Sequence, residues 1–498
     1  MSGIRVTYSG LISLLGGLIT IVTGLIFTIV ITRTLTTSEY GTWGLINGLI
    51  FYVAAIGPVI SYWVTREIAR GIESGKTAVM SSGLFSVGGM FVYIIIAYFV
   101  GLQTNADQNS LFFAAILIPF MFLNGILTAI NLGWKPHVAS YAALSIGVAQ
   151  IPMTLIFTRF FDMGIEGLIL AVVIAYVISD IILIIYGREK IKHRFKKEFL
   201  QKWLRLSWIP LYPGLALIVA GLDVVIFSII TGSVLGLAFW SAAMAMPSII
   251  SHSGLISKAV YPKLLGTSNR EYVQENLTYL FYFMILFTSI VITFARPGLF
   301  ALNPLFEIAV PITILLAIYM FFNVQSNVFL SFLTGIERVD ASEKSTFKDY
   351  VKSKLFFLPT LRLIQYSTYV ILLTVGLLLL HAKSTQLQLL IYWSITILIT
   401  EIPVTIYLYI LVRKNFTLKI ELSSVVKYLL VSIGVFGITY FLTEQYLSYK
   451  EGIFEFLPNL LLSIGLGIGG YLIITYSVDN RTRRLFSAIL KEIKGNIH

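Results

Sequence analysis

Residues 10–32 read GLISLLGGLITIVTGLIFTIVIT, a run without a single charged side chain. A helix needs about 20 apolar residues to cross the roughly 30 Å of hydrocarbon in a bilayer, and this run is long enough. It follows a short leader containing Arg5 and ends directly before Arg33. It is about twice as long as the apolar core of a signal peptide, and no small-residue cleavage site follows it. We therefore expect a retained first transmembrane helix.

Similar apolar runs recur along the whole chain, separated by short polar stretches. Long runs without polar alternation favour helices over strands, because a helix satisfies its own backbone hydrogen bonds in lipid. None of the gaps between the runs could hold a soluble domain, which needs at least about 50 residues. The sequence therefore predicts an all-α polytopic membrane protein with about 14 transmembrane helices, at 10–32, 41–64, 77–101, 111–133, 137–158, 164–187, 208–230, 234–257, 272–295, 306–333, 355–380, 386–411, 424–443 and 456–477.

The composition agrees with lipid as the solvent. Of the 498 residues, 57% are hydrophobic and 12% are charged, which is about half the charged share of a soluble domain. The absence of cysteine excludes disulfides and thiolate metal sites. The formal net charge is +12, but the basic residues lie between apolar runs. Membrane topology therefore explains them before nucleic-acid binding does, and we expect no nucleic-acid partner.

The positions of lysine and arginine predict the orientation. Cytoplasmic loops of membrane proteins are enriched in these residues. With the amino terminus placed in the cytoplasm, most of the 36 Lys and Arg residues fall in cytoplasmic segments. The outer segments then contain only Arg33, Arg159, Arg296, Lys383 and Lys450. We expect a multi-pass protein of a bacterial or archaeal cell membrane, with both termini in the cytoplasm.

The most basic loop, 188–205, separates six predicted helices from eight. The stretches TRTLTTSEYGTW (32–43) and TGSVLGLAFW (231–240) both join two apolar runs through a tight outer loop, which suggests an internal repeat. Repeats of this kind occur in transporters, where the substrate path lies between the halves. We predict one six-helix bundle at 1–200, a second at 201–415, and two extra helices with a basic cytoplasmic tail at 416–498.

Several polar side chains lie inside the predicted spans, where they are costly. Arg362, Gln365, Tyr366 and Tyr369 share one face of a helix by their i, i+3, i+4, i+7 spacing, so this stripe cannot face lipid. Other candidates for a polar cavity are Asp223 and Glu401, the carboxylates of the seventh and twelfth predicted spans. Trp43 and Asn47 lie one turn apart on the second predicted span, and Arg33 and Arg66 lie at helix ends.

Structural explanations for these residues stay open. Arg66 can be an interfacial anchor whose charge reaches the phosphates. Arg362 can pair with Glu401 to join two helices. Asp180 can be a counter-ion of the basic loop, and Asp223 can be a packing residue near the outer face. None of these alternatives needs a transported substrate.

Enzyme signatures are missing from the sequence. It has no HExxH, GxSxG or Walker motif, and its five histidines form no ligand pair at helical spacing. We therefore expect no catalytic residues, no metal site, no cofactor and no direct use of ATP.

The segment 27–71, FTIVITRTLTTSEYGTWGLINGLIFYVAAIGPVISYWVTREIARG, resembles the opening of polysaccharide-biosynthesis flippases. These belong to the multidrug/oligosaccharidyl-lipid/polysaccharide exporter superfamily, which also contains O-antigen-type and peptidoglycan-precursor flippases. The family typically reads Arg-x-Leu, a short acidic spacer and then Glu-Tyr-Gly, and Arg33, Leu35, Glu39, Tyr40 and Gly41 stand in that order here.

A second segment, 221–265, resembles the opening of the family's second bundle. Its Asp223, Gly236 and Pro262 match that pattern, and the number of helices agrees along nearly the full chain. The turn after the tenth predicted helix departs from the family: it reads GIERVDASEKS (335–345) where a Gly-Lys-like turn is usual.

The resemblance implies two six-helix bundles that open alternately to each side of the membrane. It implies a lipid-linked oligosaccharide as substrate, a sugar chain on polyprenyl or dolichyl phosphate or pyrophosphate, moved from the cytoplasmic to the outer leaflet for cell-surface polysaccharide or glycoprotein assembly. The expected phosphate-binding residues are Arg33, Arg66 and Arg362. The expected sugar contacts are Asn47, Trp43, Gln365 and Tyr366, while Asp223 and Glu401 would orient the arginines or bind a coupling cation, Na⁺ or H⁺. Membrane lipids are the other expected partners.

Two alternatives are weighed against this function. A cation-coupled multidrug or small-molecule antiporter of the same architecture predicts an acidic cavity with few basic groups. A membrane glycosyltransferase or polymerase predicts a sizeable extramembrane loop or domain, which the short and mostly uncharged outer loops of this sequence disfavour.

Overall fold

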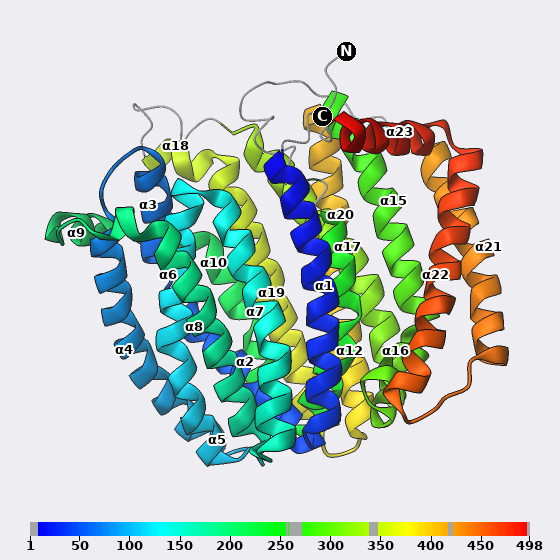
Figure 1. Cartoon of the computed structure of the whole chain (residues 1–498), viewed down its shortest axis with the longest axis horizontal. Helices are drawn as coiled ribbons and strands as arrows, with labels where there is room; N and C mark the ends of the chain where they lie inside the picture. Colours follow the sequence, from blue (N-terminus) through cyan, green and yellow to red (C-terminus); the bar gives the residue numbers. More distant parts are fainter. Residues whose placement is uncertain (1–7, 255–256, 258–270, 338–346, 417–421, 496–498) are drawn as a thin grey trace. The chain divides into compact units, whose positions relative to one another are not determined.

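The computed structural model of the chain describes residues 8–254, 257, 271–337, 347–416 and 422–495. Across these ranges the regular elements are all helices, as Figure 1 shows. Pro262 and most of the turn at 335–345 lie outside the described residues.

The first half of the chain contains nine α-helices, one 3₁₀ turn and one π-helical stretch in its described residues. They are α1 (Tyr8–Thr34), α2 (Thr37–Ala54), α3 (Pro58–Ala69), α4 (Gly75–Gly101), α5 (Gln108–Phe113), η1 (Ala114–Ile116), α6 (Leu117–Trp134), α7 (Pro136–Thr154), the π-helical η2 (Leu155–Phe160), α8 (Gly164–Ile191) and α9 (Lys197–Arg205).

The second half continues in the same manner. Its elements are α10 (Trp208–Ala220), α11 (Leu222–Thr231), α12 (Leu235–Ala245), η3 (Pro247–Gly254), α15 (Glu271–Thr293), α16 (Ala295–Leu302), η4 (Pro304–Ala309), α17 (Val310–Gly335), α18 (Phe347–Lys352), α19 (Lys354–Leu380), α20 (Gln386–Phe416), α21 (Leu422–Tyr446), α22 (Ile453–Val478) and α23 (Asn480–Gly495).

Many of these helices have the length and composition of membrane spans. Among the described residues, eleven are long and apolar enough to cross a bilayer, or up to thirteen if each of two bent helix pairs counts as one span. The first helix, α1, is 27 residues long and is not included in this number. Large apolar side chains of α4, such as Leu84, Phe91 and Phe99, are 60–66% exposed and form a surface suited to lipid. The prediction of an all-helical, multi-pass membrane protein is confirmed.

Two predicted spans are bent in the structure. The range 41–64 falls on α2 and α3, and the helix axis bends by 59° between them. The range 234–257 contains α12 and the 3₁₀ helix η3, which meet at 44°. Both breaks precede a proline, Pro58 or Pro247. Proline lacks a backbone N–H and its ring clashes with the preceding turn, so it interrupts a helix in this way.

The motif Glu39-Tyr40-Gly41 has a structural explanation in the first turn of α2. The Glu39 carboxylate accepts a hydrogen bond from the Thr36 backbone N–H at 2.8 Å, and Thr36 caps the Glu39 N–H in return, which forms a capping box. A Cβ on Gly41 would lie 2.1 Å from the carbonyl oxygen of Val234, so only glycine fits there. Tyr40 is 4% exposed. These residues therefore fix the start of α2.

The chain forms two compact units. One, here the N-terminal unit, comprises Ile12–Ser241 and Pro359–Tyr392; the other, here the C-terminal unit, comprises Met1–Leu11, Ala242–Leu358 and Trp393–His498. The core of the N-terminal unit includes apolar residues of α3 and α6 that pack around the fully buried Trp203. The division into bundles at residues 200 and 415 stays a prediction.

The basic loop 188–205 contains the short helix α9, which is attached to the end of α3. Lys202 of α9 forms an ion pair with Glu67 at 2.9 Å, and Glu67 is only 3% exposed. The indole N–H of Trp203 donates to the same carboxylate oxygen at 3.4 Å, and the Trp203 ring stacks on Phe199. The part of the loop that forms α9 is therefore fixed to α3.

The predicted basic tail continues as the helix α23, whose start is fixed by Asp479. The Asp479 carboxylate accepts hydrogen bonds from the Tyr428 hydroxyl at 2.8 Å and from the Thr482 backbone N–H at 3.1 Å. Burial acts to raise the pKa of Asp479, but these hydrogen bonds and that from Ser424 bring it below its ordinary value. Asp479 therefore joins α21, α22 and α23 as a charged carboxylate.

Candidate functional site

The polar stripe on α19 is buried in the N-terminal unit. Arg362, Gln365, Tyr366 and Tyr369 are 6%, 5%, 7% and 0% exposed. The Arg362 guanidinium donates a hydrogen bond to the Gln365 side-chain oxygen at 2.7 Å and lies 5.8 Å from the centre of the Tyr366 ring. The stripe thus places a cation, an amide and an aromatic face side by side within a membrane span.

Asp223 joins this stripe to a second helix. The Tyr369 hydroxyl donates to the Asp223 carboxylate at 2.8 Å, and the other carboxylate oxygen accepts from the Val224 backbone N–H at 2.7 Å. Asp223 lies in the first turn of α11, where the helix dipole favours a negative charge. This contact connects α11 to α19 inside the unit.

The helices α2 and α10 complete the surroundings of the stripe. Gly221 lies between α10 and α11. A Cβ on Gly221 would lie 3.1 Å from the Phe51 ring and 3.5 Å from the Tyr52 hydroxyl, so α2 packs tightly against this junction. The Tyr52 hydroxyl is buried and has no hydrogen-bond partner in the described part of the chain. On the other side, the hydroxyls of Tyr212 in α10 and Thr360 in α19 share a hydrogen bond.

Trp43 and Asn47, predicted as sugar contacts, lie on α2. Trp43 is half-buried and Asn47 is exposed. The Asn47 amide donates to the Trp43 backbone carbonyl at 2.8 Å, which is a contact within the helix. Within the described residues, no hydrogen bond, ion pair or ring contact joins either side chain to the Arg362 stripe.

Arg33 and Arg66 lie near opposite ends of the bent pair α2–α3. Arg33 is half-buried in the last turn of α1, just before α2 begins. Arg66 is exposed in the last turn of α3, and its guanidinium lies 4.0 Å above the Tyr62 ring. Helices of 18 and 12 residues at an angle of 59° separate their far ends by about 40 Å. The two arginines therefore cannot contact one phosphate group at the same time.

Glu401 forms a separate polar cluster in the C-terminal unit. It is completely buried in α20 and accepts a hydrogen bond from the Ser326 hydroxyl of α17. Nearby on α17, the Gln325 side-chain nitrogen is buried and lacks a hydrogen-bond partner among the described residues. The pairing of Glu401 with Arg362 stays a prediction, because the two residues belong to different units.

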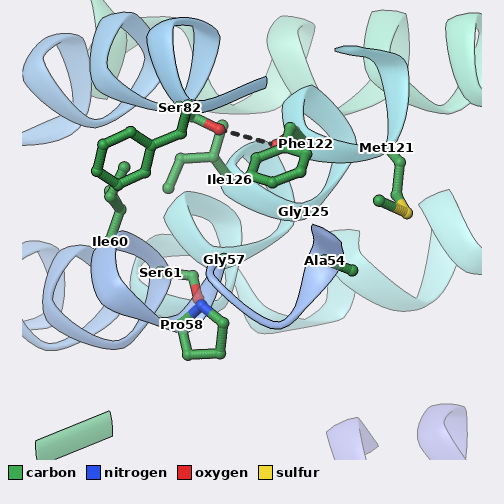
Figure 2. A pocket seen from close by; sticks show the side chains of 11 residues that line it. Ala54, Gly57, Pro58, Ile60, Ser61, Ser82, Met121, Phe122, Gly125 and Ile126 are labelled. Atoms are coloured by element: carbon green, nitrogen blue, oxygen red, sulfur yellow. Dashed lines mark hydrogen bonds between the residues drawn. The ribbon is translucent and has the colours of Figure 1, made fainter. Parts of the chain in front are cut away.

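A cavity of about 200 Å³ lies at the break between α2 and α3. Figure 2 shows Pro58 and Ser61 on one side of it and Phe122, Gly125 and other residues of α6 on the opposite side. The Ser82 hydroxyl donates to the Phe122 carbonyl at 3.1 Å at its edge. Its lining is mostly apolar and includes none of the predicted site residues.

Sequence patterns detect only part of these polar contacts. The stripe on α19 is visible as a helical periodicity, and the capping box of α2 as Thr-x-x-Glu. The hydrogen bonds between Tyr369 and Asp223, and between Tyr212 and Thr360, join residues more than a hundred positions apart and leave no local signal.

Comparisons with known proteins give no match among protein-family models and none among curated proteins. Solved structures do match. The lipid II flippase MurJ in an inward closed conformation is 16% identical with a TM-score of 0.67, over 96% of this chain and 99% of that one. An inward-facing multidrug resistance MATE family transporter of the MOP superfamily is 14% identical with a TM-score of 0.59, over 80% of this chain and 94% of that one.

A third similar structure, a MOP superfamily transporter from Pyrococcus furiosus Vc1, is 15% identical with a TM-score of 0.54, over 82% of this chain and 94% of that one. The chain therefore has the fold of MOP superfamily transporters, which agrees with the resemblance found in the sequence. The structures it resembles are of transporters and not of enzymes.

Proposed function

We propose that this protein is a transporter that moves a lipid-linked oligosaccharide from the cytoplasmic to the outer leaflet of a cell membrane by alternating access. The substrate is a polyprenyl or dolichyl phosphate or pyrophosphate that carries a sugar chain. Both termini lie in the cytoplasm, and the product serves cell-surface polysaccharide or glycoprotein assembly.

The buried cation Arg362 is the observation that carries this proposal. A charge inside a membrane span is expensive and usually marks a functional site. Arg362 is 6% exposed and donates to the neutral amide oxygen of Gln365. An arginine suits a phosphate because its planar guanidinium can donate two parallel hydrogen bonds to two phosphate oxygens. The Gln365 oxygen accepts a hydrogen bond from one guanidinium N–H. When substrate is bound, that N–H would donate to a phosphate oxygen instead.

The neighbours of Arg362 suit the rest of the head group. Gln365 offers an amide, and Tyr366 offers an aromatic face of the kind on which sugar rings stack. Trp43 and Asn47 would contact the sugar chain from α2. Asp223 holds the Tyr369 hydroxyl and thereby positions the stripe.

Arg33 and Arg66 would act at different stages of transport. Their separation along α2–α3 favours two binding steps, near the two ends of this helix pair, over one joint phosphate site. With the amino terminus in the cytoplasm, Arg66 would meet the phosphate on entry and Arg33 on release. In this proposal Arg362 would act between these two steps.

The direct test uses purified protein in liposomes with a labelled polyprenyl pyrophosphate oligosaccharide. Wild type should move the label to the opposite leaflet, where an added enzyme or quencher detects it. Arg362→Ala should reduce the rate to the protein-free background. Arg159→Ala, at an exposed position on η2, is the matched control and should keep the wild-type rate. Equal rates for Arg362→Ala and wild type would refute the assignment.

A second function, cation-coupled multidrug antiport, is favoured by the carboxylates within the spans. Glu401 is completely buried, and Asp223 lies beside the stripe. It predicts that deletion of the gene raises drug sensitivity while surface glycan stays unchanged. The opposite pattern, loss of surface glycan with unchanged drug sensitivity, supports the flippase.

A further inference from the structure

Tyr52 carries a hydroxyl group that the protein leaves unpaired. Tyr52 lies on α2, and its hydroxyl oxygen is buried without a hydrogen-bond partner in the described residues. Buried polar groups in proteins are almost always paired, so an exception needs an explanation. None of the proposed substrate contacts uses this hydroxyl.

The Tyr52 hydroxyl faces the junction of α10 and α11. A Cβ on Gly221, at this junction, would lie 3.5 Å from the hydroxyl oxygen. Gly48 lies one turn before Tyr52, and a Cβ there would lie 2.9 Å from the Val224 side chain, so α2 packs closely on α11. Between these two contacts lies Asp223. It is close enough to Tyr52 for an electrostatic interaction, but no hydrogen bond joins the two groups in the described structure.

Asp223 can accept a hydrogen bond from a bound molecule. Its carboxylate accepts from the Tyr369 hydroxyl at 2.8 Å and from the Val224 backbone N–H at 2.7 Å, and a carboxylate has room for about four donors. The side chain is partly exposed, although it lies within the span Trp208–Thr231. Lipid does not solvate a carboxylate, so the exposed part faces water or substrate.

The two groups define the chemistry of the partner that would satisfy both. It accepts a hydrogen bond from the Tyr52 hydroxyl and donates one to the Asp223 carboxylate. The carboxylate repels a phosphate, and an ammonium group cannot accept a hydrogen bond. A hydroxyl group does both through a single oxygen atom, and sugars carry several hydroxyl groups.

The position along α19 agrees with a sugar. Tyr369, which contacts Asp223, lies two turns after Arg362, or about 10 Å along the helix. A phosphate and its attached sugar span such a distance. A phosphate at Arg362 would therefore bring the first sugar of the chain to Asp223 and Tyr52.

We propose that Tyr52 and Asp223 bind a hydroxyl group of the sugar next to the phosphate, and thereby select glycolipids in which this hydroxyl is free. The proposal rests on the proposed transport function and names a feature of its substrate. Sites that hydrogen-bond a substrate hydroxyl discriminate against analogues without it, because their polar groups are then left unpaired. Glycolipids that are deoxygenated or acylated at this position are therefore poor substrates.

Binding is measured on purified full-length protein in nanodiscs. The probes are short polyprenyl pyrophosphates that carry one hexose, tested as glucose, galactose and mannose. For the hexose that binds most tightly, analogues lacking one hydroxyl at each ring position are compared with it, together with a probe without sugar. Wild type should bind one deoxy probe about tenfold more weakly than the parent hexose probe, as expected for the loss of one hydrogen bond.

The variant Tyr52→Phe removes only the hydroxyl group. It should bind the hexose probe about tenfold more weakly and should no longer discriminate against that deoxy probe, because the two changes remove the same hydrogen bond. Its affinity for the probe without sugar should stay at the wild-type value. Tyr98→Phe, at an exposed tyrosine of α4, is the matched control and should bind all probes like wild type.

Thermal unfolding without substrate separates this role from a structural one. Removal of a buried hydroxyl that has no partner should not destabilise the protein, so Tyr52→Phe should unfold at the wild-type temperature or above it. A clearly lower temperature would overturn the proposal, because the hydroxyl would then stabilise the empty protein. A second variant, Asp223→Asn, should weaken binding of the hexose probe but not of the probe without sugar, since it removes the charged acceptor.

The outcomes distinguish this site from the proposed transport function. Equal discrimination against every deoxy probe by wild type and Tyr52→Phe would overturn the sugar site, even if wild type moves the glycolipid across liposomes. Selective binding of the hexose probe without any movement across the membrane would refute the transport function and leave the site standing. An absence of binding to all probes, with no movement, would overturn both.

Discussion

The polar stripe of the N-terminal unit and the polar cluster of the C-terminal unit bury opposite charges. On α19 a cation, Arg362, lies beside an amide and an aromatic ring. Between α17 and α20 a carboxylate, Glu401, lies beside the Ser326 hydroxyl. A guanidinium stays charged at any pH that a cell experiences, whereas a carboxylate can become neutral by taking up a proton. The first cluster therefore presents a permanent positive charge, and the second presents a carboxylate held by a hydroxyl.

The largest expected effect comes from removing the charge of the first cluster while keeping its polarity. Arg362→Gln should lower the flipping rate in liposomes by about 100-fold, because it removes charge-assisted hydrogen bonds worth about 1.5–3 kcal/mol each. Arg362→Lys should recover part of the rate, since it restores the charge but not the planar fork. Full activity of Arg362→Gln would show that the two clusters do not differ in function.

The next effect concerns Glu401 and separates charge from hydrogen bonding. Glu401→Gln keeps a side-chain oxygen for Ser326 and should fold normally. Glu401→Leu leaves the Ser326 hydroxyl buried without this partner and should destabilise the protein by about 1–3 kcal/mol. Thermal unfolding in detergent measures both. Equal melting temperatures for the two variants would mean that the contact with Ser326 contributes nothing to stability.

Tyr369→Phe tests the link between the stripe and α11. It removes the hydrogen bond to Asp223, which should cost about 1.5–3 kcal/mol because the acceptor is charged. Tyr407→Phe, at an exposed tyrosine of α20, is the control. The comparison of their unfolding temperatures checks the prediction, and a larger shift for Tyr407→Phe would contradict it.

The smallest effect is expected at the helix ends. Arg66→Ala loses an exposed cation–π contact with Tyr62 worth about 0.5–1 kcal/mol. Because it also removes the positive charge assigned here to substrate entry, it should weaken glycolipid loading by a few-fold and leave the maximal rate almost unchanged. Arg33→Ala should slow release without changing loading. Saturation curves of the flipping rate distinguish the two, and an equal change in both variants would argue against separate stages.

The sequence predicts the spans well because hydropathy depends only on local composition. The predicted helix 164–187 corresponds to α8, and 306–333 to α17 with its preceding turn. Bends are missed because composition does not change at a break, although Gly57-Pro58 marks one. The helix α9 is missed because its charges match a loop, while its apolar side includes Phe199 and Trp203.

In the candidate site, contacts within one helix can be predicted from the sequence, whereas contacts between helices cannot. Arg362 and Gln365 share a helix, so their proximity follows from spacing alone. The partner of Asp180 could not be predicted, since Asn124 lies 56 positions earlier on another helix. A carboxylate inside a span signals that some partner exists, but only the packing of α6 on α8 selects an amide instead of a lysine from the nearby loop.

The attachment of α9 to α3 has a mechanical consequence. Glu67 holds Lys202 and Trp203, and only two residues separate the end of α9 from the start of α10. A displacement of α3 relative to α2 at the break near Gly57 would therefore be transmitted to α10 through α9 and two residues of chain. The short connection between α9 and α10 would then limit how far α3 and α10 could move apart.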